Sequence, residues 1–188
     1  MPAGARAGNP IWNLSRKPIE NKSPENITLK SICTDLEFYQ TMYNFDDIFP
    51  VSRMLLGAGS WRRLIAESAG DSDLEIFIQR IPALKNHLCL PDYISELINL
   101  EYTFYRISNS ADTAPKDAER IQLNPTLEIL HHRWPLAALF NKHIIPQKPG
   151  EEWLLIWKQP VTGEVIVKAA TPGELFVCKL LADDQDFI

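Results

Sequence analysis

The four histidines, His87, His131, His132 and His143, are the residues best suited to hold a metal ion. Adjacent residues on a strand point to opposite faces of a sheet, so His131 and His132 cannot easily share a metal ion. The sequence has no HxH, HxxxH or HExxH spacing. We therefore expect no metal site and no cofactor in this chain.

The cysteines, Cys33, Cys89 and Cys178, lie far apart and form no CxxC pair. His87 is two residues from Cys89, but nothing else nearby suggests a nucleophile and its base. The sequence also lacks GxSxG, P-loop and GxGxxG motifs. We expect no catalytic residue and no enzymatic activity from this chain alone. Unpaired cysteines are typical of the reducing cytoplasm, where we predict the protein resides.

Charge and hydropathy argue against two classes of partner. The 188 residues include 24 acidic and 19 basic side chains, which give a net charge of −5. Binding to nucleic acids or anionic membranes relies on basic surfaces. No apolar run approaches the roughly 20 residues that span a bilayer. We expect neither nucleic acid nor membrane as a partner. A DNA-binding regulator remains the alternative, although Arg62–Arg63 is the only adjacent basic pair in its predicted folded part.

The elements predicted from periodicity and capping signals form an α+β fold, an N-terminal helical bundle followed by a small antiparallel sheet of about three strands with helices. Residues 1–27 are rich in Pro, Gly, Asn and Ser and are predicted to be a flexible arm. Residues 28–108 form the predicted helical domain, and 121–188 a small α+β domain that binds a peptide or partner. A polar stretch, SNSADTAPKDAE, separates the two domains.

Within the helical domain, apolar spacing predicts helices over residues 28–43 and 91–107. Between them, Gly57 and Gly59 should end one helix, and Ser60 should cap the next. A further helix begins near Asp73, and Pro82 should interrupt it or begin a new one.

Glu101 falls in the middle of the apolar face of helix 91–107. A carboxylate buried alone there would cost several kcal/mol, so we expect a partner such as Arg62, Arg63 or Arg106. The alternative is that Glu101, together with Arg106, lies at an interface with another protein.

In the C-terminal domain, a strand is predicted over residues 126–131 and a short helix begins at Pro135. The runs WLLIW and EVIVK flank turn-forming residues and predict a hairpin. Thr171, Pro172 and Glu174 form a helix start with a capping box. Leu175, Phe176, Leu180 and Leu181 should be the apolar face of that helix.

The hairpin is the candidate binding surface. A sheet this small has exposed edges, and an extended peptide can add to an edge through main-chain hydrogen bonds. The alternative is that its large side chains fill the core between sheet and helix. The candidate peptide-binding residues are Trp153, Leu155, Trp157, Val165, Ile166 and Val167.

Several stretches resemble the HvfC-type family. They are FDDIFPVSRMLLGAGSWRRLIAE, LPDYISELINLEYTFYRI, LNPTLEILHHRWPLAALF and EEWLLIWKQPVTGEVIVKAATPGELFVCKLLADD, and the resemblance covers Leu36 to Asp183. Members of this family accompany multinuclear iron-dependent oxidative enzymes, which are TIM-barrel proteins that modify ribosomally made peptides. The short length and the polar arm are most similar to the small subunits of methanobactin biosynthesis.

This resemblance implies two partners: an MbnB-like TIM-barrel iron subunit and an MbnA-like precursor peptide. The iron subunit would hold the iron and convert cysteines of the precursor to oxazolone and thioamide groups. This chain would bind the leader part of the precursor and contribute no iron ligand. Arg133 and Trp134, at the joint between the predicted strand and short helix, are expected to lie close to the partner subunit, along with Glu101 and Arg106.

Overall fold

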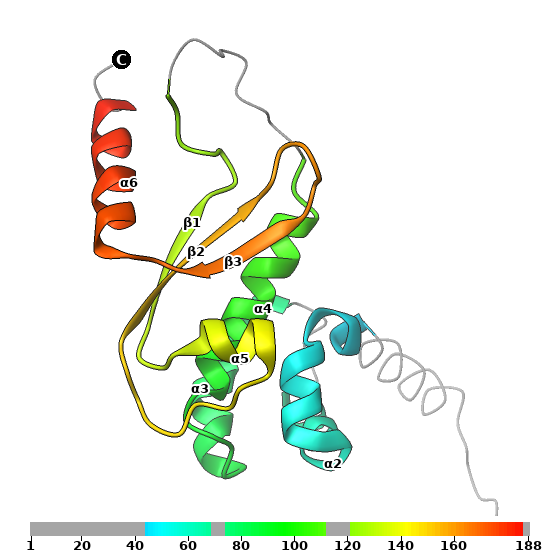
Figure 1. The fold of residues 1–188 in the computed structure, drawn as a ribbon. Coiled ribbons are helices and arrows are strands. Elements are labelled where there is room, and N and C mark those ends of the chain that lie inside the picture. The colour runs from blue at the N-terminus through cyan, green and yellow to red at the C-terminus, as the bar shows by residue number, and fades with distance from the viewer. Residues whose placement is uncertain (1–43, 69–73, 112–120, 186–188) are drawn as a thin grey trace, which may run out of the picture.

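A computed structural model describes residues 44–68, 74–111 and 121–185 of the chain (Figure 1). Its named elements are α2 (Pro50–Ser68), α3 (Leu74–His87), α4 (Ile94–Ser108), β1 (Glu128–His132), α5 (Leu136–Lys142), β2 (Glu152–Lys158), β3 (Val165–Ala169) and α6 (Pro172–Gln185). The strands form one antiparallel sheet in the order β1-β2-β3, which confirms the α+β class. The predicted arm over residues 1–27 and the helix over 28–43 lie outside the described residues.

Helix α2 is kinked at Gly57, whose backbone angles are φ 70° and ψ 161°. Because only glycine adopts such angles readily, the break occurs there. Ser60 lies inside the helix, so the prediction that it is an N-cap is wrong. Helix α3 runs through Pro82, so the predicted interruption is wrong too. Phe77 and Ile81 are fully buried beside this proline, and their packing offsets the hydrogen bond that proline cannot donate.

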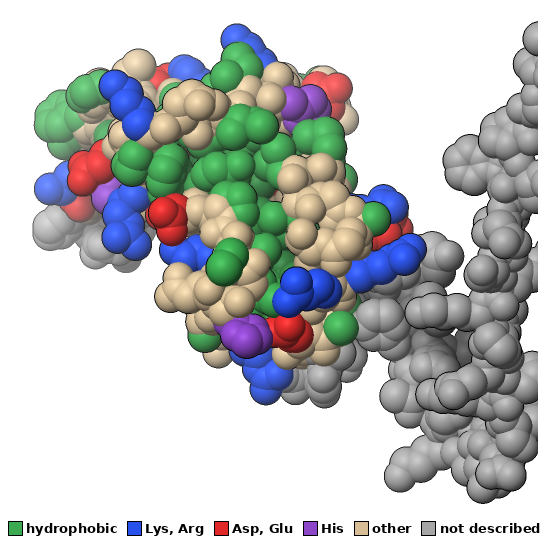
Figure 2. All heavy atoms as spheres, turned by 90° about the horizontal axis from the view of Figure 1, so that it is seen from below, with side chains coloured by type: hydrophobic (Ala, Val, Ile, Leu, Met, Phe, Trp, Pro, Cys, Tyr) green, Lys and Arg blue, Asp and Glu red, His purple; other side chains and the backbone are tan. Residues whose placement is uncertain are grey.

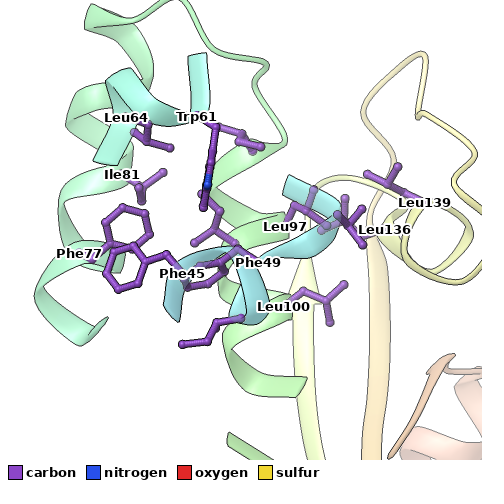
Figure 3. Close-up of a cluster of buried hydrophobic side chains, with 14 of the residues drawn as sticks. Phe45, Phe49, Trp61, Leu64, Phe77, Ile81, Leu97, Leu100, Leu136 and Leu139 are labelled. Carbon is purple, nitrogen blue, oxygen red and sulfur yellow. The ribbon is translucent and has the colours of Figure 1, made fainter. Parts of the chain in front are cut away.

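The helical half is built around an aromatic cluster. The ring centroid of Phe77 lies 4.6 Å from that of Phe45 and 5.5 Å from that of Phe49. Trp61 completes the cluster, 6.1 Å from Phe49, and its Nε1–H donates to Asp46 Oδ1 at 2.6 Å. Figure 3 shows these rings gathered close to Leu64 of α2 and Ile81 of α3.

The core continues from the helices into the sheet. Figure 3 also shows Leu97 and Leu100 of α4 beside Leu136 and Leu139 of α5, and all four are fully buried. Leu154 and Ile156 of β2 and Val167 of β3 belong to the same cluster of buried side chains. The predicted helical and α+β domains therefore share one hydrophobic core.

The sheet follows the prediction closely. β2 and β3 form the expected hairpin, with Trp157 opposite Ile166, and β1 pairs with the other side of β2. The start of α6 also matches: Glu174 N–H donates to Thr171 Oγ1 at 3.3 Å, and Thr171 N–H donates to Glu174 Oε2 at 2.9 Å. This is the reciprocal pair of a capping box.

Only part of the predicted apolar face of α6 is buried. The helix stands on the far side of the sheet from α4 (Figure 1). Phe176 is 62% exposed and Leu180 is 52% exposed, whereas Leu175 and Leu181 are half-buried. The prediction is wrong for Phe176 and Leu180, because hydrophobic spacing identifies a helix but not which of its sides meets the sheet.

Within the described ranges, no helix is both long and apolar enough to cross a membrane.

Candidate functional site

The predicted peptide-binding residues lie on two different faces of the sheet. Val167 belongs to the buried core and Val165 packs against it. Side chains alternate between faces along a strand, so Ile166 lies on the opposite face. The register pairs Ile166 with Trp157, and Leu155 and Trp153 follow on the same face of β2. We call this second surface the open face.

The open face is apolar and partly covered by α6. Trp153 is 44% exposed and Ile129 of β1 is 40% exposed, whereas Leu155 between them is 7% exposed. The Trp153 ring stacks on the imidazole of His131 with centroids 4.5 Å apart. A groove of about 420 Å³ runs between this face and α6. It is lined by Leu123, Leu127, Ile129, Trp153, Leu175, Cys178, Lys179 and Ala182.

The hydrogen-bond pattern shows which backbone groups face outward on β3. Gln159 N–H donates to Glu164 O at 2.8 Å, and Ala170 N–H donates to Trp153 O at 2.7 Å. In an antiparallel ladder the bonding residues alternate, so Ile166 also bonds to β2. A proline at Ile166 would therefore remove a hydrogen bond within the hairpin.

The outward-facing groups of β3 belong to Val165, Val167 and Ala169. One of them is occupied, because the Val167 carbonyl accepts a hydrogen bond from Asn141 Nδ2 at 3.0 Å. Helix α5, which carries Asn141, therefore restricts this edge.

The outer edge of β1 is less obstructed. The backbone hydrogen bonds of β2 toward β1 come from residues 152, 154 and 156. Their partners in β1 are His132, Leu130 and Glu128. The backbone groups of Ile129 and His131 consequently point outward, and within the described ranges they have no hydrogen-bond partner. Ile129 also lines the groove beside α6, so an accessible strand edge and an apolar groove meet at this residue.

Glu101 is buried as predicted, but its partners are not arginines. Its carboxylate is 2% exposed and accepts hydrogen bonds from the backbone N–H groups of Val51 at 2.6 Å and Ser52 at 3.0 Å. These donors belong to the first turn of α2, where unpaired N–H groups attract an anion. Burial raises the pKa of Glu101 to about 7, and the two backbone hydrogen bonds oppose that rise only in part. Arg106 instead pairs with Glu128 at 2.6 Å.

The residues predicted at the partner interface make separate local contacts. The Arg133 side chain is 83% exposed, and its Nε lies 3.6 Å from Glu96 Oε1. The Trp134 ring is partly buried against Tyr93, with centroids 5.7 Å apart. Arg133 is thus available to another molecule, whereas the Glu101 carboxylate is used inside the chain.

The two adjacent histidines point to opposite faces, as predicted. The side chain of His131 is 41% exposed, whereas that of His132 is 3% exposed. Among the residues that the structure describes, no group of three or more His, Cys, Asp or Glu side chains could hold a metal ion.

The sequence reasoning missed Ile129 and Leu127 as part of the candidate binding surface. The alternation of apolar residues in LEILHH was a usable signal, because it places Leu127, Ile129 and His131 on one face. The sequence matches no protein-family model and no curated protein.

Proposed function

We propose that this protein is the noncatalytic subunit of a heterodimeric iron-dependent oxidase that modifies a peptide, as MbnC is in methanobactin biosynthesis. It binds the leader of an MbnA-like precursor. It also supports an MbnB-like iron subunit, which converts precursor cysteines to oxazolone and thioamide groups. The chain itself contributes no iron ligand.

The observation that carries the proposal is the free outer edge of β1 beside an apolar groove. A peptide that adds to this edge would pair with the outward N–H and C=O groups of Ile129 and His131. Every second peptide side chain would then point toward the open face, where Trp153 and the groove beside α6 offer apolar contact. Main-chain pairing provides affinity and the groove provides selectivity.

Exposed hydrophobic surface supports the role of a subunit in a complex. Figure 2 shows hydrophobic side chains gathered in a band across the end of the molecule that carries α2, α3 and α5. Ile144 and Ile145, in the connection between α5 and β2, are 57% and 46% exposed. Large exposed apolar patches mark interaction sites, and partner proteins cover them. Arg133 provides a charged group for the same kind of contact.

Leader binding is tested with proline substitutions at the two edges. Ile129→Pro removes an outward N–H from β1 and breaks no bond to β2, so the chain should fold. Fluorescence polarisation with a labelled precursor peptide should show affinity reduced about tenfold, as expected for one lost hydrogen bond and a disturbed strand. The matched control is Ala169→Pro, which changes an outward position on β3. Unchanged affinity of a folded Ile129→Pro variant would refute the β1 site, and a loss in Ala169→Pro alone would place the leader on β3.

Assembly is tested by co-expression with the iron subunit, followed by size-exclusion chromatography and metal analysis. We expect a 1:1 complex that contains iron, while the chain alone contains none. Alanine at both Arg133 and Trp134 should weaken the complex without unfolding the chain. The proposed role would be refuted if the chain formed no complex with the iron subunit, or if the isolated chain bound iron.

A further inference from the structure

A second pocket lies where one face of α4 meets the start of α2 and the C-terminal part of α5. Glu101, Phe104, Tyr105 and Ser108 line it from α4, at positions that share one face of a helix. Phe140 of α5 and three apolar residues around the start of α2 also line it. The volume is about 250 Å³, below the roughly 300–1,000 Å³ of sites for drug-sized ligands, so the pocket suits a single side chain.

The pocket is separate from the surface proposed for the leader. Its described lining residues lie just before or in α2, in α4 and in α5, and the strands contribute none of them. It also shares no described residue with the groove beside α6. A ligand in this pocket would therefore leave both the β1 edge and the groove open.

Three aromatic rings give the pocket walls that suit a cation as well as an apolar chain. Phe104 and Phe140 are partly buried, with ring centroids 5.2 Å apart. Tyr105 is 38% exposed, so its ring reaches solvent where the pocket opens. The faces of aromatic rings attract ammonium groups, and the same rings pack against methylene groups. The walls therefore suit both parts of an alkylammonium group.

The charge that lines the pocket is negative. Asp47 and Glu101 line it, and no described lysine or arginine does. Glu101 is 2% exposed, and its oxygens already accept hydrogen bonds from the backbone N–H groups of Val51 and Ser52. These N–H groups replace a counter-ion only in part, because burial still raises the pKa of Glu101. A ligand does not need to touch the carboxylate, since an opposite charge within about 4–6 Å stabilises it.

Charge complementarity separates the possible ligands. Both carboxylates would repel an anion. An uncharged apolar group would remove the remaining water from around Glu101 and offer no interaction in exchange. A cation would stabilise the ionised carboxylate, and the exposed Asp47 and the hydroxyl oxygen of Ser108 can accept from its N–H groups. Lysine combines such a cation with a four-carbon stem that packs on apolar walls.

We propose that this pocket binds the side chain of a lysine from a partner protein. The stem packs against the aromatic walls, and the ammonium group occupies the part of the pocket nearest Glu101. The site is a property of the free chain, so it does not depend on the proposed oxidase role.

The test is an NMR titration of the ¹⁵N-labelled full chain with two probes of matched shape. Nα-acetyl-lysine amide carries the ammonium group, and Nα-acetyl-norleucine amide has the same stem without it. The backbone amides of Val51 and Ser52 report binding, because they donate to Glu101, and the amide of Gly163 is the remote reference. At about pH 8 the lysine probe should shift Val51 and Ser52 to saturation and bind about tenfold more tightly than the norleucine probe.

The two probes should respond to pH in opposite ways. Because the pKa of Glu101 is about 7, its carboxyl is mostly protonated at about pH 6 and mostly ionised at about pH 8. A cation binds best to the ionised form, so affinity for the lysine probe should rise by up to about tenfold over this range, while affinity for the norleucine probe falls. The other titratable groups nearby are Asp47 and Tyr105, which line the pocket, and His143, which follows α5. Affinities that change in parallel with pH would overturn the proposed site.

Glu101→Gln assigns the effect to one carboxyl. It should remove the pH dependence and weaken binding of the lysine probe about tenfold at about pH 8, because the attraction between the two charges is lost. The matched control is Glu151→Gln, which removes a carboxylate that is 79% exposed and does not line the pocket, and both probes should bind it as they bind wild type. A pH dependence that survives in Glu101→Gln would overturn the role of Glu101.

Butylammonium separates a lysine side chain from a free amine, because it has the same stem and ammonium group without a peptide backbone. If the pocket admits a lysine of a protein, its opening must accommodate the backbone, so butylammonium and the lysine probe should bind with similar affinity. Binding of butylammonium alone would refute a protein ligand and indicate a small amine. Equal binding of the norleucine and lysine probes would refute recognition of the charge and indicate an apolar side chain. If no probe shifts Val51 and Ser52 to saturation, the pocket is not a binding site.

Discussion

Replacing Glu101 with glutamine should change how the stability of this protein depends on pH. Burial raises the pKa of the Glu101 carboxyl from 4.5 to about 7. A raised pKa means that the folded state holds the proton more tightly than the unfolded state does. The protonated Glu101 carboxyl contributes fully to the free energy of unfolding below about pH 4.5, and this contribution is lost as the pH rises through about 7.

The size of this effect follows from the shift. Each pKa unit corresponds to 1.36 kcal/mol, so ionising Glu101 in the folded state lowers the free energy of unfolding by about 3 kcal/mol. Glutamine keeps an oxygen that can accept from Val51 or Ser52, and it has no charge to desolvate. The free energy of unfolding of Glu101→Gln, measured relative to wild type, should therefore rise by about 3 kcal/mol as the pH increases from about 4 to about 8.

Urea unfolding followed by tryptophan fluorescence measures this difference at each pH. Glu151→Gln is the matched control, because it removes a carboxylate whose side chain is 79% exposed and should follow the wild-type profile. Equal pH profiles for Glu101→Gln and wild type would refute the reasoning. They would mean that the two backbone N–H groups of α2 fully offset the cost of burying the charge.

Four further substitutions test three local features by urea unfolding. Gly57→Ala should cost about 1–3 kcal/mol, because φ 70° and ψ 161° suit only glycine. The control Gly59→Ala lies in ordinary helical backbone and should stabilise the chain by about 0.5–1 kcal/mol. Equal effects of the two substitutions would refute the kink at Gly57. Trp61→Phe should cost about 1–2 kcal/mol through loss of the 2.6 Å hydrogen bond to Asp46, and no loss would show that this bond contributes nothing. Thr171→Ala should destabilise α6 by about 1 kcal/mol and reduce its helical circular dichroism, unless the capping box is irrelevant to that helix.

Local signals in the sequence were enough for the secondary structure of the C-terminal half. The apolar run Trp153–Trp157 and the turn after it predict the hairpin, because strand and turn preferences act between residues close in the chain. Thr171 and Glu174 predict the start of α6 for the same reason: a capping box spans a single helical turn.

The helical half shows where local signals fail. Pro82 should interrupt a helix, yet α3 continues because the buried side chains around it favour the helix. The burial of Glu101 could be predicted from its place on an apolar face, but its partners could not. The donors lie about fifty positions earlier in the chain, at the start of α2, and only the packing of α2 on α4 brings them to the carboxylate.

The candidate sites divide in the same way. The sequence by itself determined that a small sheet with exposed edges and large apolar side chains would form, since alternation and turn residues specify this locally. Only the tertiary structure decided that Val165 and Val167 face the core and that β1 has the less obstructed edge. Strand register, the position of α6 and the packing of α4 against β1 set these features, and each depends on contacts between residues far apart in the chain.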